Sequence, residues 1–153
     1  MEKFNHIELN NEVTKRGENG FFKLEKDQEA IAEFLREVDY RTVKFSSEMK
    51  RLRYLVEENF YYNIFDKYIE DEIVECLELA KNFKFEFKSY MAASKFYKDY
   101  ALKTNDKKQY LENFNQHVFI VAMYLGDGNT ALAKELMIAM LEQRLQPATP
   151  TFL

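Results

Sequence analysis

The sequence predicts an all-α fold, a compact helical domain of about six helices. Hydrophobic residues make up 46% of the 153 residues and include 14 Phe and 10 Tyr, which is ample material for a core. Turn residues are scarce, with only 4 Gly and 2 Pro, whereas β-sandwiches and barrels normally need more of them. Apolar side chains also recur at helical spacing along most of the chain.

The first two helices are expected to follow a polar, irregular N-terminal stretch that ends in a short strand over Phe21–Glu25. Asp27 is the predicted N-cap of the first helix. Its apolar stripe consists of Ile31, Phe34, Leu35 and Val38. Ser46 or Ser47 is expected to cap the second helix, because a serine hydroxyl accepts a hydrogen bond from a free backbone N–H. The second stripe consists of Met49, Leu52 and Val56.

The third helix is predicted to begin at about Glu70, because the acidic triplet Glu70-Asp71-Glu72 suits the positive end of a helix dipole. Its apolar face consists of Ile73, Cys76, Leu77 and Ala80. The stripe of the fourth helix consists of Ala93, Phe96, Tyr97 and Tyr100. Asn105 and Asp106 then form a polar break that ends this helix.

The fifth and sixth helices are expected on either side of a turn at Asp127-Gly128-Asn129. The apolar stripe of the fifth consists of Leu111, Phe114, Val118, Val121 and Leu125. Gly126 is predicted to end it as a left-handed cap. The stripe of the sixth consists of Leu132, Leu136 and Met140. Pro147 and Pro150 prevent this helix from continuing, so the remaining residues are expected to be extended.

The charge pattern argues against a nucleic-acid partner. The net charge is −4, and 22 basic residues are interspersed with 26 acidic ones, whereas a nucleic-acid binder usually presents a basic face. The basic residues that come nearest to such a face have acidic neighbours. We interpret them as solvated helix faces: Lys50, Arg51, Arg53, Lys103, Lys107 and Lys108.

A cytoplasmic location without a membrane partner is predicted. The N-terminus Met1-Glu2-Lys3-Phe4-Asn5 has no apolar run that could act as a signal peptide. No stretch approaches the roughly 20 apolar residues that a membrane helix needs. Cys76 is the only cysteine, so an internal disulfide is impossible and a reducing compartment is the expected setting.

No catalytic or metal-binding residue is predicted from spacing alone. His6 and His117 lack partners at metal-ligand spacing, and Glu112 precedes His117 at a distance that misses the Glu-x-x-His pattern of helical di-metal sites. Cys76 is interpreted as a buried, inert thiol. Gly126-Asp127-Gly128 lacks the Gly-Lys-Ser/Thr ending of a phosphate-binding loop, so a helix cap and turn is expected there.

The aromatic run Phe60-Tyr61-Tyr62 is expected to pack in a core or an interface rather than to stack on bases. Without further information, the residues described so far predict a soluble helical domain to which no role can be assigned.

Four segments, taken together, are more specific. They are Val13-Thr14-Lys15 with Phe21 to Asp27, Leu52 to Asn59 with Tyr61-Tyr62, Phe96 to Lys108 with Tyr110-Leu111-Glu112, and Gln146-Pro147-Ala148-Thr149-Pro150-Thr151-Phe152-Leu153. In this order and spacing they resemble the N-terminal region of ribonucleotide reductase large subunits, particularly those of class Ib. The resemblance covers nearly the whole chain, from about residue 9 to 153.

The resemblance implies a domain division and one substrate contact. Residues 1–145 would form the N-terminal helical domain, with a partial regulatory cone-like region over 1–45. Residues 146–153 would form the entry strand of a ten-stranded α/β barrel, truncated here. Thr149 would bind the substrate nucleotide near its phosphates, since a hydroxyl and a backbone N–H both donate to anions, and Thr151 is a weaker neighbour. Alternatively, both threonines only shape the strand entry.

The resemblance also implies that the chemistry lies beyond Leu153, so no catalytic residue, metal or cofactor is expected in this chain. The complete enzyme implies redox cysteines, a metal-radical small subunit and a nucleotide effector. The expected partners are the remaining large-subunit polypeptide with the catalytic barrel, the radical-generating small subunit, a second copy in a homodimer and the nucleotide substrate.

The leading interpretation is the N-terminal part of a split or truncated ribonucleoside-diphosphate reductase large subunit, inactive until the barrel joins it. A non-catalytic module that binds a nucleotide or competes for an interface is one alternative, and an inert remnant is another. Family members commonly carry an aromatic residue and a histidine where this chain has Lys44 and Ser46, in the region where an inhibitory nucleotide binds. The resemblance therefore does not by itself imply such a nucleotide site in this chain. They also carry Glu-Asp-Arg in place of Asn115-Gln116-His117.

Overall fold

The computed structural model describes residues 24–144, and this part contains six α-helices. They are α2 (Leu24–Tyr40), α3 (Glu48–Glu57), α4 (Glu70–Asn82), α5 (Tyr90–Lys95), α6 (Phe114–Gly126) and α7 (Thr130–Leu141). A 3₁₀ turn, η1 (Ile64–Asp66), follows α3, and a π-helical turn, η2 (Phe96–Tyr100), continues α5. Over these residues β-pairing is limited to isolated bridges from Tyr110 to Thr42 and Lys103, so the predicted all-α fold is confirmed.

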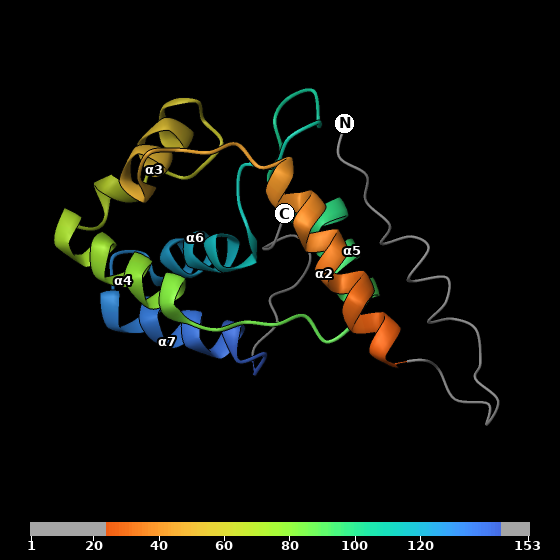
Figure 1. Ribbon diagram of the computed structural model, residues 1–153. Helices are drawn as coiled ribbons and strands as arrows, with labels where there is room; N and C mark the ends of the chain where they lie inside the picture. Colours follow the sequence, from red (N-terminus) through yellow and green to blue (C-terminus); the bar gives the residue numbers. More distant parts are fainter. Residues whose placement is uncertain (1–23, 145–153) are drawn as a thin grey trace.

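The helices form two groups (Figure 1). In the first group α6 packs against α4 and α7, and α3 adds Leu52 and Leu55 to their shared core. In the second group α2 packs against α5, and the core between them includes Phe34, Val38 and Tyr97. The half-buried ring of Phe114, at the start of α6, packs against both cores and therefore joins them.

Polar side chains fix where the helices begin. Ser47 is the N-cap of α3, as predicted, and its Oγ accepts a hydrogen bond from the backbone N of Lys50 at 3.2 Å. At the start of α6, Asn113 and Gln116 form a capping box in which each side chain accepts from the other's backbone N–H. Asn129 caps α7 in the same way as Ser47 caps α3.

The predicted start of the first helix is wrong. Helix α2 already begins at Leu24, so the end of the strand expected over Phe21–Glu25 is helical, and its first part lies outside the described residues. Asp27 therefore lies within the helix and does not cap it. Its carboxylate instead accepts a hydrogen bond from the backbone N of Tyr90 at 3.1 Å, which ties α2 to the start of α5.

The predicted ends of the fifth helix are also wrong, for two physical reasons. Leu111 precedes α6, because its backbone N donates to the carbonyl of Leu102 in an extended pairing. Gly126 is the last helical residue, and the left-handed cap is Asp127, with φ 45°. A Cβ at Gly126 would lie 2.7 Å from the Tyr68 hydroxyl and 2.9 Å from the Ala133 Cβ, so the close approach of α7 is what requires glycine there.

The predicted apolar stripes are correct in part. All four residues of the third stripe are buried in α4, which begins at Glu70 as expected. Leu125 and Leu132, by contrast, keep 38% and 39% of their surface exposed. The buried side of α7 consists of Ala133, Met137, Met140 and Leu141. Among residues 24–144, no helix is long and apolar enough to cross a membrane.

We expect Ser47→Ala to lower the free energy of unfolding by about 1 kcal/mol, because it leaves the backbone N–H of Lys50 without its cap. Urea denaturation followed by circular dichroism measures this change. Ser46→Ala is the matched control and should change stability by less than about 0.5 kcal/mol. Equal losses in both variants would contradict the assignment of the cap to Ser47.

Candidate functional site

Three polar side chains are almost fully buried where the two groups of helices meet. Arg51 of α3 is 3% exposed, Glu112 of the segment before α6 is 1% exposed, and His117 in the first turn of α6 is 5% exposed. Tyr61, which follows α3, is 9% exposed and completes a hydrogen-bonded group with them. We call Arg51, Tyr61, Glu112 and His117 the buried polar cluster.

Glu112 is the centre of the buried polar cluster. Its Oε1 accepts a hydrogen bond from the backbone N of Leu102 at 3.0 Å and lies 2.5 Å from Nδ1 of His117. Its Oε2 accepts the hydroxyl proton of Tyr61. Burial and then the charge of Glu112 raise the pKa of Tyr61 well above its ordinary value. Tyr61 therefore keeps its proton and remains a donor to the carboxylate.

Arg51 links the cluster to the surface of α3. Its Nε donates to Oε2 of Glu48 at 3.2 Å, and its Nη1 donates to the Tyr61 hydroxyl at 3.0 Å and the Leu111 carbonyl at 3.3 Å. Burial alone would lower the pKa of Arg51, but Tyr61, Glu48 and Glu112 outweigh that effect and the pKa is raised. Arg51 is therefore a permanently charged group inside the protein.

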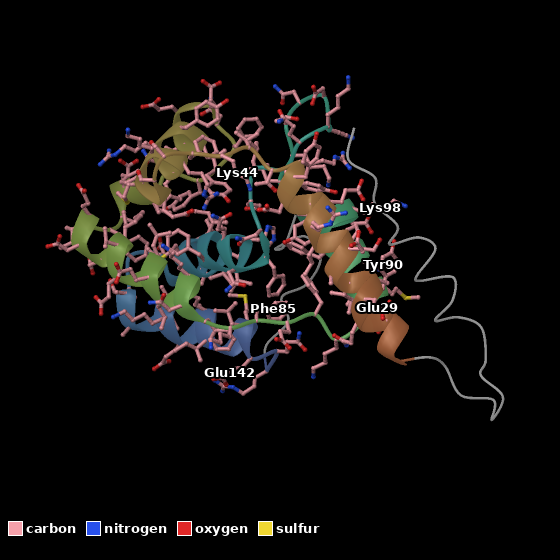
Figure 2. The ribbon with its side chains drawn as sticks, in the orientation of Figure 1. Glu29, Lys44, Phe85, Tyr90, Lys98 and Glu142 are labelled. Carbon is pink, nitrogen blue, oxygen red and sulfur yellow. The ribbon has the colours of Figure 1, made fainter. Side chains whose placement is uncertain are left out.

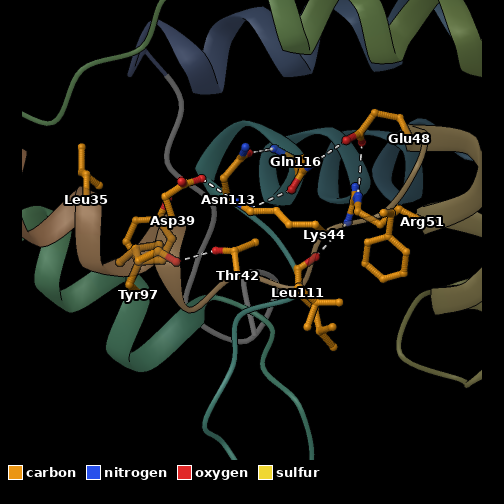
Figure 3. Close-up of a pocket in the computed structure, with 13 residues that line it drawn as sticks. Leu35, Asp39, Thr42, Lys44, Glu48, Arg51, Tyr97, Leu111, Asn113 and Gln116 are labelled. Atoms are coloured by element: carbon orange, nitrogen blue, oxygen red, sulfur yellow. Dashed lines mark hydrogen bonds and ion pairs between the residues drawn. The ribbon is translucent and has the colours of Figure 1, made fainter. Parts of the chain in front are cut away.

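A cavity of about 410 Å³ opens beside Arg51, between α2, α3 and the start of α6 (Figure 3). We call it the Arg51 pocket. It is lined by Leu35, Val38, Asp39, Thr42, Val43, Lys44, Phe45, Glu48, Arg51, Tyr97, Leu111, Asn113 and Gln116. Two opposite charges, Lys44 and Asp39, form an ion pair of 2.6 Å on its rim, where both are largely exposed. On the other side, Gln116 donates to Glu48 at 2.8 Å.

A second cavity of about 380 Å³ adjoins the first and is more aromatic. The two share Leu35, Tyr97 and Asn113 as wall residues. Phe85, on the connection between α4 and α5 in Figure 2, stacks on Phe114 with a centroid distance of 4.0 Å. A polar pocket, whose lining carries two basic and two acidic side chains, thus shares wall residues with a pocket walled by rings.

The structure changes the interpretation of one predicted surface residue. The sequence predicts that Arg51 lies on a solvated face with Lys50 and Arg53, and that prediction is wrong for Arg51, which is 3% exposed. Arg51 lies on the buried side of α3 with Leu52 and Leu55. Its guanidinium is therefore inside the protein, where it donates a hydrogen bond to the Tyr61 hydroxyl. The sequence did not reveal this site because Tyr61 lies beyond the end of α3, so helical spacing does not relate it to Arg51.

The other chemical predictions can be checked where the structure describes them. Cys76 is a fully buried free cysteine, as predicted, and burial raises the pKa of its thiol. Tyr61 packs in the larger core, as expected for the aromatic run. Over residues 24–144, no group of three His, Cys, Asp or Glu side chains is placed to hold a metal ion. Thr149, Thr151 and His6 lie outside the described residues.

Two family models match the chain one after the other. The model described as "Ribonucleotide reductase N-terminal" matches residues 6–85, and the model described as "Ribonucleotide reductase, all-alpha domain" matches residues 86–153. The chain belongs to the ribonucleotide reductase large-subunit family. It corresponds to the N-terminal region of that subunit, which confirms the resemblance found in the four sequence segments.

Individual relatives agree with the family models. The ribonucleoside-diphosphate reductase subunit alpha of Bacillus subtilis (strain 168) is 44% identical over 151 residues, which are 96% of this chain and 21% of that protein. The NrdEB subunit alpha of the same strain is 43% identical over 153 residues, 97% of this chain and 14% of that protein. A Mycoplasma pneumoniae subunit alpha is 38% identical and is covered to 19%. The similarity to NrdE-type subunits assigns the chain to class Ib.

The two matched segments of this reductase family are interleaved in space. Helices α2, α3 and α4 belong to the first segment and α5, α6 and α7 to the second, yet each of the two cores contains helices of both. The buried polar cluster has the same property, with Arg51 and Tyr61 from the first segment and Glu112 and His117 from the second. The cluster is therefore a joint between the two family segments.

We expect Glu112→Ala to lower the free energy of unfolding by about 3–5 kcal/mol, because it leaves the buried charge of Arg51 with less compensation and the Tyr61 hydroxyl without its acceptor. Urea denaturation of the 153-residue chain measures the loss. Glu135→Ala, which removes an exposed carboxylate from α7, is the control and should change stability by less than about 0.5 kcal/mol. A loss below about 1 kcal/mol for Glu112→Ala would contradict the central role of this carboxylate.

Proposed function

We propose that the chain is the N-terminal helical part of a ribonucleoside-diphosphate reductase large subunit. In this role it contributes to the reduction of ribonucleotides to deoxyribonucleotides for DNA synthesis when the catalytic barrel joins it. The observation that carries the proposal is the uninterrupted match of two family models over residues 6–85 and 86–153. Since the chain spans only 14% to 21% of the relatives' length, its contribution is structural support for chemistry performed elsewhere.

The proposed domain boundaries within the chain follow from its membership in this family. Residues 1–145 form the helical domain, residues 1–45 include a partial regulatory cone, and residues 146–153 enter the first strand of the barrel. The tightly packed core around α6 supports a scaffold role, since α6 is buried along most of its length. In this proposal the helical domain presents the entry strand at a fixed position.

Thr149 is the one substrate-contacting residue in the proposal. Its hydroxyl and backbone N–H donate to the phosphates of the nucleotide in the assembled enzyme, and Thr151 lies nearby. The redox cysteines and the radical site belong to the barrel. The further partners are the metal-radical small subunit, a nucleotide effector and a second copy of the large subunit, and the setting is the cytoplasm.

The test of this function is reconstitution. The chain is co-expressed with the small subunit and a class Ib large-subunit polypeptide that lacks the matching N-terminal region, and reduction of ribonucleoside diphosphates is measured. We expect the chain to co-purify with the large-subunit polypeptide and to restore a turnover that it does not have alone. Failure of the two polypeptides to associate, or association without turnover, would contradict the proposal.

In the reconstituted enzyme, we expect Thr149→Ala to raise KM for the nucleotide about tenfold, the equivalent of one lost hydrogen bond to a charged group. Thr149→Ser keeps the hydroxyl and should restore most of the affinity. Steady-state kinetics with varied substrate separates KM from kcat. If both variants match the original enzyme, Thr149 only shapes the strand entry.

A second function, binding of a regulatory nucleotide, is favoured by the Arg51 pocket. Arg51 and Lys44, which pair with the lining carboxylates of Glu48 and Asp39, are the positive charges that phosphates would contact. Hydrogen-bonding groups come from Thr42, Asn113 and Gln116. Lys44 is free to turn toward a ligand, because its ion pair with Asp39 is largely exposed and therefore weak. The adjoining cavity, walled by Phe85, Phe87 and Phe114, suits a planar base.

We expect the 153-residue chain to bind at least one of dATP, dAMP and ATP, and Arg51→Lys to weaken that binding at least about tenfold, because lysine cannot reproduce the forked geometry of the guanidinium. Isothermal titration calorimetry measures both. Arg53→Lys, on the exposed side of the same helix, is the matched control and should bind as the unchanged chain does. No heat with any of the three nucleotides would exclude this second function.

A further inference from the structure

Lys103 lies where the segment between η2 and α6 passes the C-terminal end of α2 (Figure 1). The sequence predicts this lysine on a solvated helix face, but η2 ends at Tyr100, so Lys103 is on an irregular segment and is half-buried. Its Nζ donates to the carbonyl of Lys98 at 2.9 Å and to the carbonyl of Ala101 at 3.2 Å. Within residues 24–144, Lys103 forms no ion pair with a carboxylate.

The two hydrogen bonds of Lys103 suit a neutral amine as well as an ammonium. An ammonium has three N–H groups, whereas a neutral amine has two N–H groups and a lone pair. Since only two carbonyls accept from Nζ, loss of one proton costs Lys103 neither hydrogen bond. A lysine paired with a carboxylate would lose that attraction when it became neutral. Lys103 therefore keeps its place in the structure as a nucleophilic amine.

A second cation is held close to Lys103 by the ring of Tyr110. The Arg41 guanidinium carbon lies 5.3 Å from the centroid of this ring, and Nζ of Lys103 lies 5.6 Å from it. Arg41 is fixed there, because its Nε donates to the carbonyl of Lys108 at 3.0 Å. Two like charges thus share one ring, and each disfavours the charged form of the other.

The remaining charges that face Lys103 come from the turn itself, from η2 and from the segment before α6. Burial is the largest cause that lowers the pKa of Lys103, and the charges of Lys107 and Arg41 add to it. Asp99 and Glu112 act in the opposite direction without offsetting these effects. The neutral amine is therefore more populated at Lys103 than at an ordinary exposed lysine.

We propose that Lys103 is an acyl-acceptor lysine, which an acyl phosphate modifies. The lone pair of Nζ attacks the acyl carbon and forms a C–N bond, while the C–O bond to the phosphate breaks. The phosphate leaves with the electron pair of that bond, and the surplus proton of the amine passes to water. A negatively charged donor suits this place, because residues 98–108 carry four lysines and two aspartates in a chain of net charge −4.

Acylation changes the contacts that Lys103 makes. The product is an uncharged amide with a single N–H, so it can serve only one of the two carbonyls and no longer places a cation over Tyr110. The backbone of Tyr110 donates to Arg41 at 3.0 Å and accepts from Val43 at 2.9 Å. The modification therefore acts where the end of α2 is attached to the segment that leads into α6.

The test treats the folded 153-residue chain with acetyl phosphate at pH 7 and measures the initial rate of acetylation at each lysine by mass spectrometry. Lys50, which is exposed on α3, is the reference within the same molecule. We expect Lys103 to react at least about threefold faster than Lys50, because more of its amine is neutral. The advantage should shrink as the pH approaches the ordinary pKa of lysine, about 10.4, since both amines then become neutral.

Two neighbouring lysines provide a matched pair of variants. Lys107→Gln removes an exposed charge that acts on Lys103, and we expect it to lower the rate ratio of Lys103 to Lys50 at least about twofold. Lys108→Gln removes the adjacent exposed charge, which is not among those that shift Lys103, and should change the ratio less. Circular dichroism shows whether each variant is folded.

Two results would overturn the proposal. One is acetylation of Lys103 in the unchanged chain at the rate of Lys50 or more slowly. The other is equal slowing of Lys103 by Lys107→Gln and Lys108→Gln, which would show that the local arrangement does not activate this amine. Both results are read on the chain alone and require no reductase activity, so they are independent of the function proposed above.

Discussion

The fold depends most on the buried carboxylate of Glu112. Moving a carboxylate out of water costs several kcal/mol, and this cost is offset only when hydrogen bonds and opposite charges surround the group. The Tyr61 hydroxyl, the Leu102 backbone and His117 each contact it directly, and the Arg51 charge lies one hydrogen bond away. These groups come from four separate places in the chain. Because the carboxylate must keep these contacts to offset its burial, the buried polar cluster favours the observed arrangement.

This constraint connects the two family segments, because the groups around Glu112 come from both of them. The pairs of α4 with α6 and α7, and of α2 with α5, rest mainly on apolar contacts, which tolerate small shifts. Only a few polar contacts, such as the one from Tyr90 to Asp27, join these helices directly. Hydrogen bonds between Tyr61 and Glu112 do not tolerate them. The capping box of Asn113 and Gln116 follows Glu112 directly, so the start of α6 is fixed at the same place as the joint. Asn113 and Gln116 therefore both fix the start of α6 and line the Arg51 pocket.

The parts of the fold that were predictable are those set by neighbouring residues. The stripe of α4, the cap at Ser47 and the turn at Asp127-Gly128-Asn129 all depend on residues within a few positions of one another. The need for glycine at position 126 could not be predicted in this way, because it comes from the close approach of Tyr68 and Ala133. The predicted cap was therefore placed one residue early.

The candidate site could not be predicted from the spacing of residues along the chain. Metal-ligand spacing applies to two residues on one helix, but Glu112 lies before α6 begins, so helical spacing does not govern Glu112 and His117. The Tyr61–Glu112 bond joins residues 51 positions apart, and the Arg51–Leu111 bond spans 60. A signal for Arg51 was present, since it falls on the same helical face as Leu55, four positions later. The family, by contrast, was recognisable because its motifs are local in sequence.

The central claim is that the buried polar cluster holds the two family segments together as one cooperative unit. Native-state hydrogen exchange tests it most directly, read at the backbone amide of Leu102, which donates to Glu112. The account predicts that this amide opens with the same free energy as the amides of α3 and α6, which means that all three exchange only when the whole domain unfolds. Exchange of Leu102 at a clearly lower free energy, while α6 stays protected, would contradict it.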